Sequence, residues 1–150
     1  MAGQIQASPM GAPQQFQFMA TLSGSMEVPP EVSTGSGLAW LGLDPTLTAL
    51  RVLLAVSNLN QTTVAHIHLG RPGQNGPIVL FLFGPSAPMN IGAPTALTNA
   101  TFTAANLTGP LAGMPLSVLA QQMLAGNTYV NVHTVAHPNG EIRGPVVLKS

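Results

Sequence analysis

The sequence predicts an all-β domain, a sandwich or barrel of about eight strands with one short helix near residues 115–125. Three observations lead to this fold class. Short runs of alternating apolar and polar residues recur along the chain. Clusters of Gly, Pro, Asn and Asp separate these runs as turns and loops. A single segment has apolar residues at helical spacing, and no repeat of 20–50 residues is evident.

The first segments of the domain alternate between strand and turn. Residues 16–23 alternate with period two, so a strand would place four apolar side chains on one face: Phe16, Phe18, Ala20 and Leu22. Residues 24–35 are a loop, because the Pro-Pro pair cannot continue a hydrogen-bonded ladder. Residues 37–43 form the next strand, and the Asp-Pro-Thr sequence at 44–46 turns the chain.

The middle of the chain predicts three more strands. Residues 47–59 form a long strand, and residues 62–70 form the following one. Residues 71–77 are consecutive turn formers. The run at 78–83 is apolar on both faces, which predicts a strand buried on both sides. Residues 84–96 contain several prolines and are expected to be irregular.

The last part of the chain contains the one predicted helix. Residues 96–104 are a strand. In residues 115–126 five apolar side chains recur at helical spacing before a terminating glycine: Leu116, Leu119, Ala120, Met123 and Leu124. Residues 128–136 and 141–149 close the domain as strands. The domain therefore covers residues 16–150, and residues 1–15, rich in Gly, Pro and Gln, are expected to be an arm that is flexible or held by a partner.

Charged residues are scarce, which excludes some partners and favours others. The chain carries 4 Lys and Arg against 4 Asp and Glu, so its net charge is zero. It has no basic patch for nucleic acid, and no apolar run approaches the roughly 20 residues of a membrane-spanning helix. An uncharged surface favours association between copies of the chain, because electrostatic self-repulsion is weak. The alternative is a soluble monomer with a surface rich in amide and hydroxyl groups.

The absence of cysteine excludes disulfides and thiolate metal sites. The N-terminus has neither a basic start nor an apolar run, so no signal peptide is visible. Glycosylation sequons occur at Asn60, Asn99 and Asn106, and they matter only in a eukaryotic secretory pathway.

The four histidines fall in two short segments of the chain. His66 and His68 point to the same face of a strand, and the alternation at 128–136 also aims His133 to one face. If these strands are neighbours, three imidazoles converge on a copper or zinc site, with His137 as a candidate fourth ligand. Binding is expected to weaken below about pH 6.5, the unperturbed His pKa. The alternative is that these are histidines hydrogen-bonded to the backbone.

The few acidic residues do not form a catalytic pattern. No Ser-His-Asp arrangement or pair of carboxylates across a cleft is evident. Glu27 is expected to pair with Arg143 or to accept backbone N–H groups, so both residues are interpreted as structural. Arg143 also shares a strand face with Glu141, which favours a local ion pair between them or capping of a carboxylate or backbone carbonyls by Arg143.

Four stretches together resemble the CHRD (chordin-type) domain family: residues 18–30, 35–44, 64–83 and 126–146. The most specific parts are the Glu-Val-Pro-Pro loop, the His-Ile-His-Leu-Gly strand and the run from Tyr-Val-Asn-Val-His-Thr to Gly-Glu-Ile-Arg-Gly. The resemblance spans nearly all of the chain beyond the arm. It implies a secreted or cell-surface β-domain without enzymatic activity.

The chain is also similar, more distantly, to copper-zinc superoxide dismutase, which implies a Greek-key barrel. In that resemblance His66, His68 and His133 take the places of copper ligands, and Arg143 takes the place of an arginine near the metal. A bridging histidine and a zinc-binding loop are missing from the sequence. The resemblance therefore implies a mononuclear copper site, and dismutase activity is not expected.

Two functions follow from these observations. The first is a non-enzymatic structural module outside the cell or on its surface, which assembles into a homo-oligomer, coat or fibre through the arm and the uncharged surface. The second is a copper-binding protein with a histidine site. The two are compatible, because an assembling subunit can also carry metal.

Overall fold

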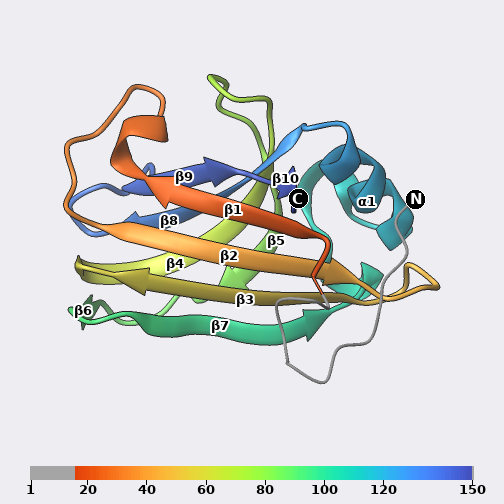
Figure 1. The fold of residues 1–150 in the computed structure, drawn as a ribbon, viewed down its shortest axis with the longest axis horizontal. Helices are drawn as coiled ribbons and strands as arrows, with labels where there is room; N and C mark the ends of the chain where they lie inside the picture. The colour runs from red at the N-terminus through yellow and green to blue at the C-terminus, as the bar shows by residue number, and fades with distance from the viewer. Residues whose placement is uncertain (1–15, 150) are drawn as a thin grey trace.

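The computed structural model describes residues 16–149, which fold into one barrel-like sheet with a helix at one end (Figure 1). The expected arm at residues 1–15 lies outside the described residues. The strands are β1 (Phe18–Ser23), β2 (Ser36–Leu43), β3 (Leu50–Ser57), β4 (Leu59–Leu69), β5 (Ile78–Phe83), β6 (Met89–Ile91), β7 (Thr95–Phe102), β8 (Thr128–Thr134), β9 (Ile142–Pro145) and β10 (Val147–Leu148). The helices are α1 (Leu116–Leu124) and the short 3-10 turns η2 (Gly24–Met26), η3 (Ala104–Asn106) and η4 (Gly109–Leu111).

The sheet is antiparallel and nearly closed, with the strand order β5-β4-β8-β9-β1-β2-β3-β7. The two edge strands approach each other, and Thr98 Oγ1 of β7 donates a hydrogen bond to the Leu82 carbonyl of β5 at 3.0 Å. Once the barrel closes, four of its strands lie in the spatial order β8-β4-β5-β7. The last of them in the chain, β8, lies beside the first, β4, and this arrangement is a Greek key. The predicted all-β Greek-key barrel is confirmed.

The core lies inside this barrel. The alternation of residues 16–23 correctly predicts which side chains of this segment belong to the core. Phe16, Phe18, Ala20 and Leu22 are all at most 2% exposed. The neighbouring strands contribute their own alternate residues, so the inner face is continuous around the barrel.

Helix α1 covers one end of the barrel (Figure 1), and four of its five predicted apolar residues are buried. The fifth, Leu124, is 61% exposed, because it lies on the outer side of the last turn. Gly126 follows with φ of +78°, the left-handed conformation that ends the helix. No helix of the described chain is long and apolar enough to cross a membrane.

Two predicted strands are each divided in the structure. In the segment 47–59 the strand stops at Ser57, because Asn58 takes φ of +56° and turns the chain into β4. The segment 141–149 is divided after Pro145, which has no N–H to continue the ladder. Val146 then turns inward, and β10 follows as a separate pair with β1.

Two further expectations for the middle of the chain are wrong. The segment 84–96 is not wholly irregular, because it contains β6, which pairs with β4. Strand β5 is not buried on both sides, because Phe81 is 40% exposed. Its ring contacts His66 outside the barrel wall instead of entering the core.

Candidate metal centre

The site is built on the pairing of β4 with β8. In this antiparallel ladder His66 lies opposite Asn131, His68 opposite Tyr129, and His133 opposite Val64. Ile67 points into the core, so His66 and His68 point together to the outer face. His133 reaches the same face from β8, and the sheet therefore brings the three histidines together, as their strand periodicity predicts.

Loops cover this outer face and make it a cleft of about 820 Å³. They come from the segment after η2, from the β4–β5 connection and from the β8–β9 connection. The three histidines lie in the cleft wall and are only 4–8% exposed. They are therefore removed from bulk water although no core residue encloses them.

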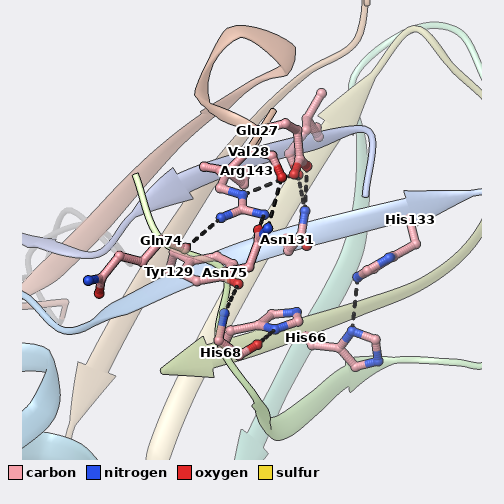
Figure 2. A network of polar contacts seen from close by, with 12 residues as sticks. Glu27, Val28, His66, His68, Gln74, Asn75, Tyr129, Asn131, His133 and Arg143 are labelled. Atoms are coloured by element: carbon pink, nitrogen blue, oxygen red, sulfur yellow. Dashed lines mark hydrogen bonds and ion pairs between the residues drawn. The ribbon is translucent and has the colours of Figure 1, made fainter. Parts of the chain in front are cut away.

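Each histidine offers one ring nitrogen to a shared point, and these atoms all lie within 4.8 Å of one another. His66 Nδ1 is 3.1 Å from His133 Nε2. The ring centroids of His66 and His68 are 5.4 Å apart (Figure 2). Imidazole nitrogens bind a copper or zinc ion at roughly 2.0–2.1 Å, so the three side chains would have to move closer together to share one ion.

Backbone carbonyls fix the tautomers of two of these histidines. His68 Nδ1 lies 2.9 Å from the Gly76 carbonyl, and His133 Nδ1 lies 3.0 Å from the Pro138 carbonyl. A carbonyl can only accept a hydrogen bond, so each Nδ1 carries the proton and each Nε2 is an unprotonated acceptor. His68 Nε2 is buried and has no hydrogen-bond partner. Metal-binding imidazoles usually donate their other ring N–H to a carbonyl or carboxylate in the same way.

His66 uses its other nitrogen. Since His133 Nε2 is an acceptor, the 3.1 Å contact requires His66 Nδ1 to carry the proton when no ion is present. The edge-to-face ring of Phe81, at 4.5 Å between centroids, supports the His66 imidazole from the other side. The candidate donor set is therefore His66 Nδ1, His68 Nε2 and His133 Nε2.

The environment keeps these imidazoles neutral. Burial lowers the pKa of His66 to about 3, and the neighbouring His133 and His68 add to that effect. Burial also lowers the pKa of His68 to about 4, although its bond to Gly76 opposes the shift. The pKa of His133 is lowered for the same main reason. These lowered pKa values favour an onset of proton competition below the pH of about 6.5 expected of unperturbed imidazoles.

A buried ion pair lies beside the histidines in the same cleft (Figure 2). Arg143 Nε donates to Glu27 Oε1 at 3.0 Å, and Asn131 Nδ2 donates to Glu27 Oε2 at 2.6 Å. Burial raises the pKa of Glu27, while Arg143 and Asn131 oppose the rise. The pairing is the first of the two alternatives that the sequence left open for Glu27.

Of the two alternatives for Arg143, the ion pair with Glu141 is not made, whereas the capping of a carboxylate and of a carbonyl is. Glu141 does not pair with Arg143 but accepts from Ser33 Oγ at 2.6 Å and from Thr134 Oγ1 at 2.8 Å. The loop between β8 and β9 bends the backbone at Glu141, which aims its side chain at these hydroxyls. His137 is not one of the three grouped histidines, and its Nδ1 lies 3.4 Å from Glu31 Oε1.

Comparison with known families identifies the domain. A model of the CHRD domain matches residues 18–146. The chain belongs to the CHRD domain family. No curated protein and no solved structure gives a significant match. The three histidines, Glu27 and Arg143 all lie within the part of the chain that matches the CHRD domain.

Sequence reasoning identified the ligand candidates of this CHRD domain but not their supports. Tyr129 and Asn131 precede His133 by four and two residues in the same strand, so their shared face is the available signal for them. The sequence contains no signal for the carbonyls of Gly76 and Pro138, since every residue has a carbonyl and only the loop conformation selects one.

Proposed function

We propose that this CHRD domain binds a single copper ion through His66 Nδ1, His68 Nε2 and His133 Nε2. The observation that carries the proposal is the pair of carbonyl-fixed tautomers, which leaves two unprotonated Nε2 atoms in a group whose ligand atoms all lie within 4.8 Å of one another. The strongest single observation is His68 Nε2, which is buried and has no hydrogen-bond partner. An unpaired buried polar atom costs about 1–3 kcal/mol, and a bound ion relieves that cost.

The chemistry of the donor set favours copper. All three donors are imidazole nitrogens, which suit copper and zinc. Among divalent first-row metals, sites with such donors bind Cu(II) most tightly. The Arg143 charge is paired with Glu27, which weakens the repulsion of a cation, although Arg143 still lowers the pKa of His68 and His133.

Calorimetric titration of metal-free protein with Cu(II) tests this function. The wild type should bind one ion, and His68→Ala and His133→Ala should each bind at least tenfold more weakly, since each removes a ligand. His137→Ala is the matched control, because this histidine lies outside the group, and it should bind like the wild type. Equal affinity in all four proteins would overturn the proposal.

A second function, self-assembly outside the cell or on its surface, is favoured by a feature of the barrel's outer face. Met19, Trp40 and Leu53 lie in direct cross-strand register on β1, β2 and β3. Their neighbours Phe18, Leu41 and Leu54 point inward, so this row points outward and remains partly exposed. With zero net charge, two copies have little repulsion to overcome.

Light scattering tests this second function and the expected part of the arm. Wild-type protein should form particles larger than a monomer, and deletion of residues 2–15 should leave a folded monomer. Folding should survive because the buried core begins at Phe16. Particles of unchanged size after the deletion would exclude the arm as the connector, and a monomeric wild type would exclude self-assembly.

A further inference from the structure

Arg143 uses its whole guanidinium to connect three parts of the cleft. Its Nε donates to Glu27 at 3.0 Å. Its Nη1 donates to the Gln74 carbonyl at 3.0 Å, and its Nη2 donates to Asn75 Oδ1 at 2.7 Å. Two of the three contacts are therefore with the β4–β5 loop, which links Arg143 on β9 to a segment nearly 70 residues earlier.

This loop also carries the carbonyl that fixes His68. Asn75 Nδ2 donates to the Val28 carbonyl at 2.9 Å, so both ends of its amide are held. The next residue, Gly76, donates its N–H to Tyr129 Oη at 3.0 Å and presents its carbonyl to His68 Nδ1 at 2.9 Å. The position of the Gly76 carbonyl therefore depends on the bonds that hold Asn75.

Arg143 also reaches His68 through an aromatic ring. The Arg143 guanidinium carbon lies 4.2 Å from the centroid of the Tyr129 ring. The His68 ring stacks on Tyr129 with 4.7 Å between centroids and 6° between planes. In Figure 2 Tyr129 lies between Arg143 and His68. The stacking on Tyr129 thus sets the plane of the His68 imidazole. The bond to the Gly76 carbonyl sets how the ring is turned within that plane.

We propose that Arg143 and Asn75 are positioning residues of the metal site, which hold the Gly76 carbonyl against His68 Nδ1 and thereby direct His68 Nε2 at the ion. The proposal rests on the copper site proposed above. Its structural part, the control of the His68 tautomer, applies to the metal-free protein as well. Outer-shell partners of this kind typically change metal affinity 10- to 100-fold.

The geometry separates this role from a purely electrostatic one. Glu27 pairs with Arg143 and reduces, without cancelling, the positive charge that lowers the pKa of His68 and His133. What Arg143 supplies is a planar fork of donors at fixed angles, which lysine cannot reproduce. Arg143→Lys therefore keeps the charge beside Glu27 and removes the two bonds to the loop.

The experiment compares Asn75→Ala and Arg143→Lys with a matched pair elsewhere on the barrel. Arg51 Nη2 donates to Asn99 Oδ1 at 2.9 Å on the outer face of β3 and β7, so Asn99→Ala and Arg51→Lys remove an equivalent bond far from the cleft. Asn75→Ala leaves the buried Glu27–Arg143 pair intact, which keeps a folded test protein available if Arg143→Lys does not fold.

The first measurement is imidazole nitrogen NMR of the metal-free proteins. Wild type and both controls should show His68 as the pure Nδ1–H tautomer, and the two test variants should show a mixture of tautomers. The second measurement is Cu(II) affinity, which should fall 10- to 100-fold in the test variants and change less than twofold in the controls.

Two results would overturn the inference. One is an unchanged His68 tautomer in Asn75→Ala, whatever the affinity. The other is a changed tautomer with Cu(II) affinity within twofold of the wild type. If the wild type binds no copper at all, the proposed function fails, and the tautomer measurement still decides whether Asn75 and Arg143 position His68.

Discussion

The nitrogen His66 Nδ1 lies 3.1 Å from His133 Nε2, so two of the candidate ligands are hydrogen-bonded to each other. His133 is the acceptor, because its own Nδ1 is held by the Pro138 carbonyl. In the proposed site an ion can bind His66 Nδ1 only when the proton moves from Nδ1 to Nε2 of the same ring, so that the imidazole stays neutral. Metal binding would therefore replace the hydrogen bond between His66 and His133.

The stability of the metal-free protein should decrease as the pH falls from about 6.5 towards 4. In the unfolded chain a histidine binds a proton below about pH 6.5. In the folded protein His66 and His68 remain neutral until the pH approaches about 3 and about 4. The unfolded state therefore binds more protons in this window, and each such histidine lowers the free energy of unfolding by about 1.4 kcal/mol per pH unit.

Urea unfolding at pH 7, 6 and 5 measures this effect. The midpoint should fall at each step, and His68→Gln should show a shallower fall than the wild type. A midpoint that stays constant between pH 7 and pH 5 contradicts the neutral burial of these imidazoles.

Copper binding should persist well below the pH at which ordinary histidines lose their metals. Because the lowered pKa values of His66 and His68 lie near 3 and 4, protons do not compete strongly at pH 5.5. The affinity at pH 5.5 should stay within about threefold of that at pH 7, whereas unperturbed imidazoles would lose roughly tenfold per ligand. Competition with a chelator of known affinity at both pH values checks this, and a loss of tenfold or more would count against it.

Glu27→Gln should destabilise the protein by about 3 kcal/mol, because it leaves the buried charge of Arg143 without its partner. The matched control is Glu31→Gln, which alters a half-exposed contact with His137 at 3.4 Å and should change stability by less than about 0.5 kcal/mol. Urea midpoints of the three proteins give the comparison. An equal midpoint for Glu27→Gln and wild type would show that the pair contributes nothing.

Gly76→Ala should distort the loop that carries the His68 carbonyl partner. An added Cβ would overlap the carbonyl of Leu69, so the backbone must move, at a cost of roughly 2 kcal/mol or more. Gly92→Ala is the control, because a Cβ there meets nothing within 4 Å, and its effect should be within about 0.5 kcal/mol. Thermal unfolding measures both, and similar transitions for the two variants would contradict the close approach at Gly76.

Strand periodicity carried most of the correct expectations about the fold. The alternation of β1 and the helical spacing of α1 are local properties, and each is satisfied by burying one face of one element. Expectations failed where a local pattern had more than one solution. The apolar run of β5 could be buried on both sides or on one, and Phe81 is exposed because no second layer covers that part of the barrel wall.

The sequence by itself determined that His66 and His68 share a face, because two residues apart in a strand must do so, and it aimed His133 to one face of its own strand. Only the tertiary structure decided that β4 and β8 are neighbours, since pairing depends on how the whole barrel closes. It also decided which carbonyls hold the rings. The bond from His68 to Gly76 depends on the β4–β5 loop, which Arg143 contacts from a distant position in the chain, and the bond from His133 to Pro138 depends on the β8–β9 loop. A side-chain type can be read from a sequence, but the direction of a backbone carbonyl exists only once the loops have packed.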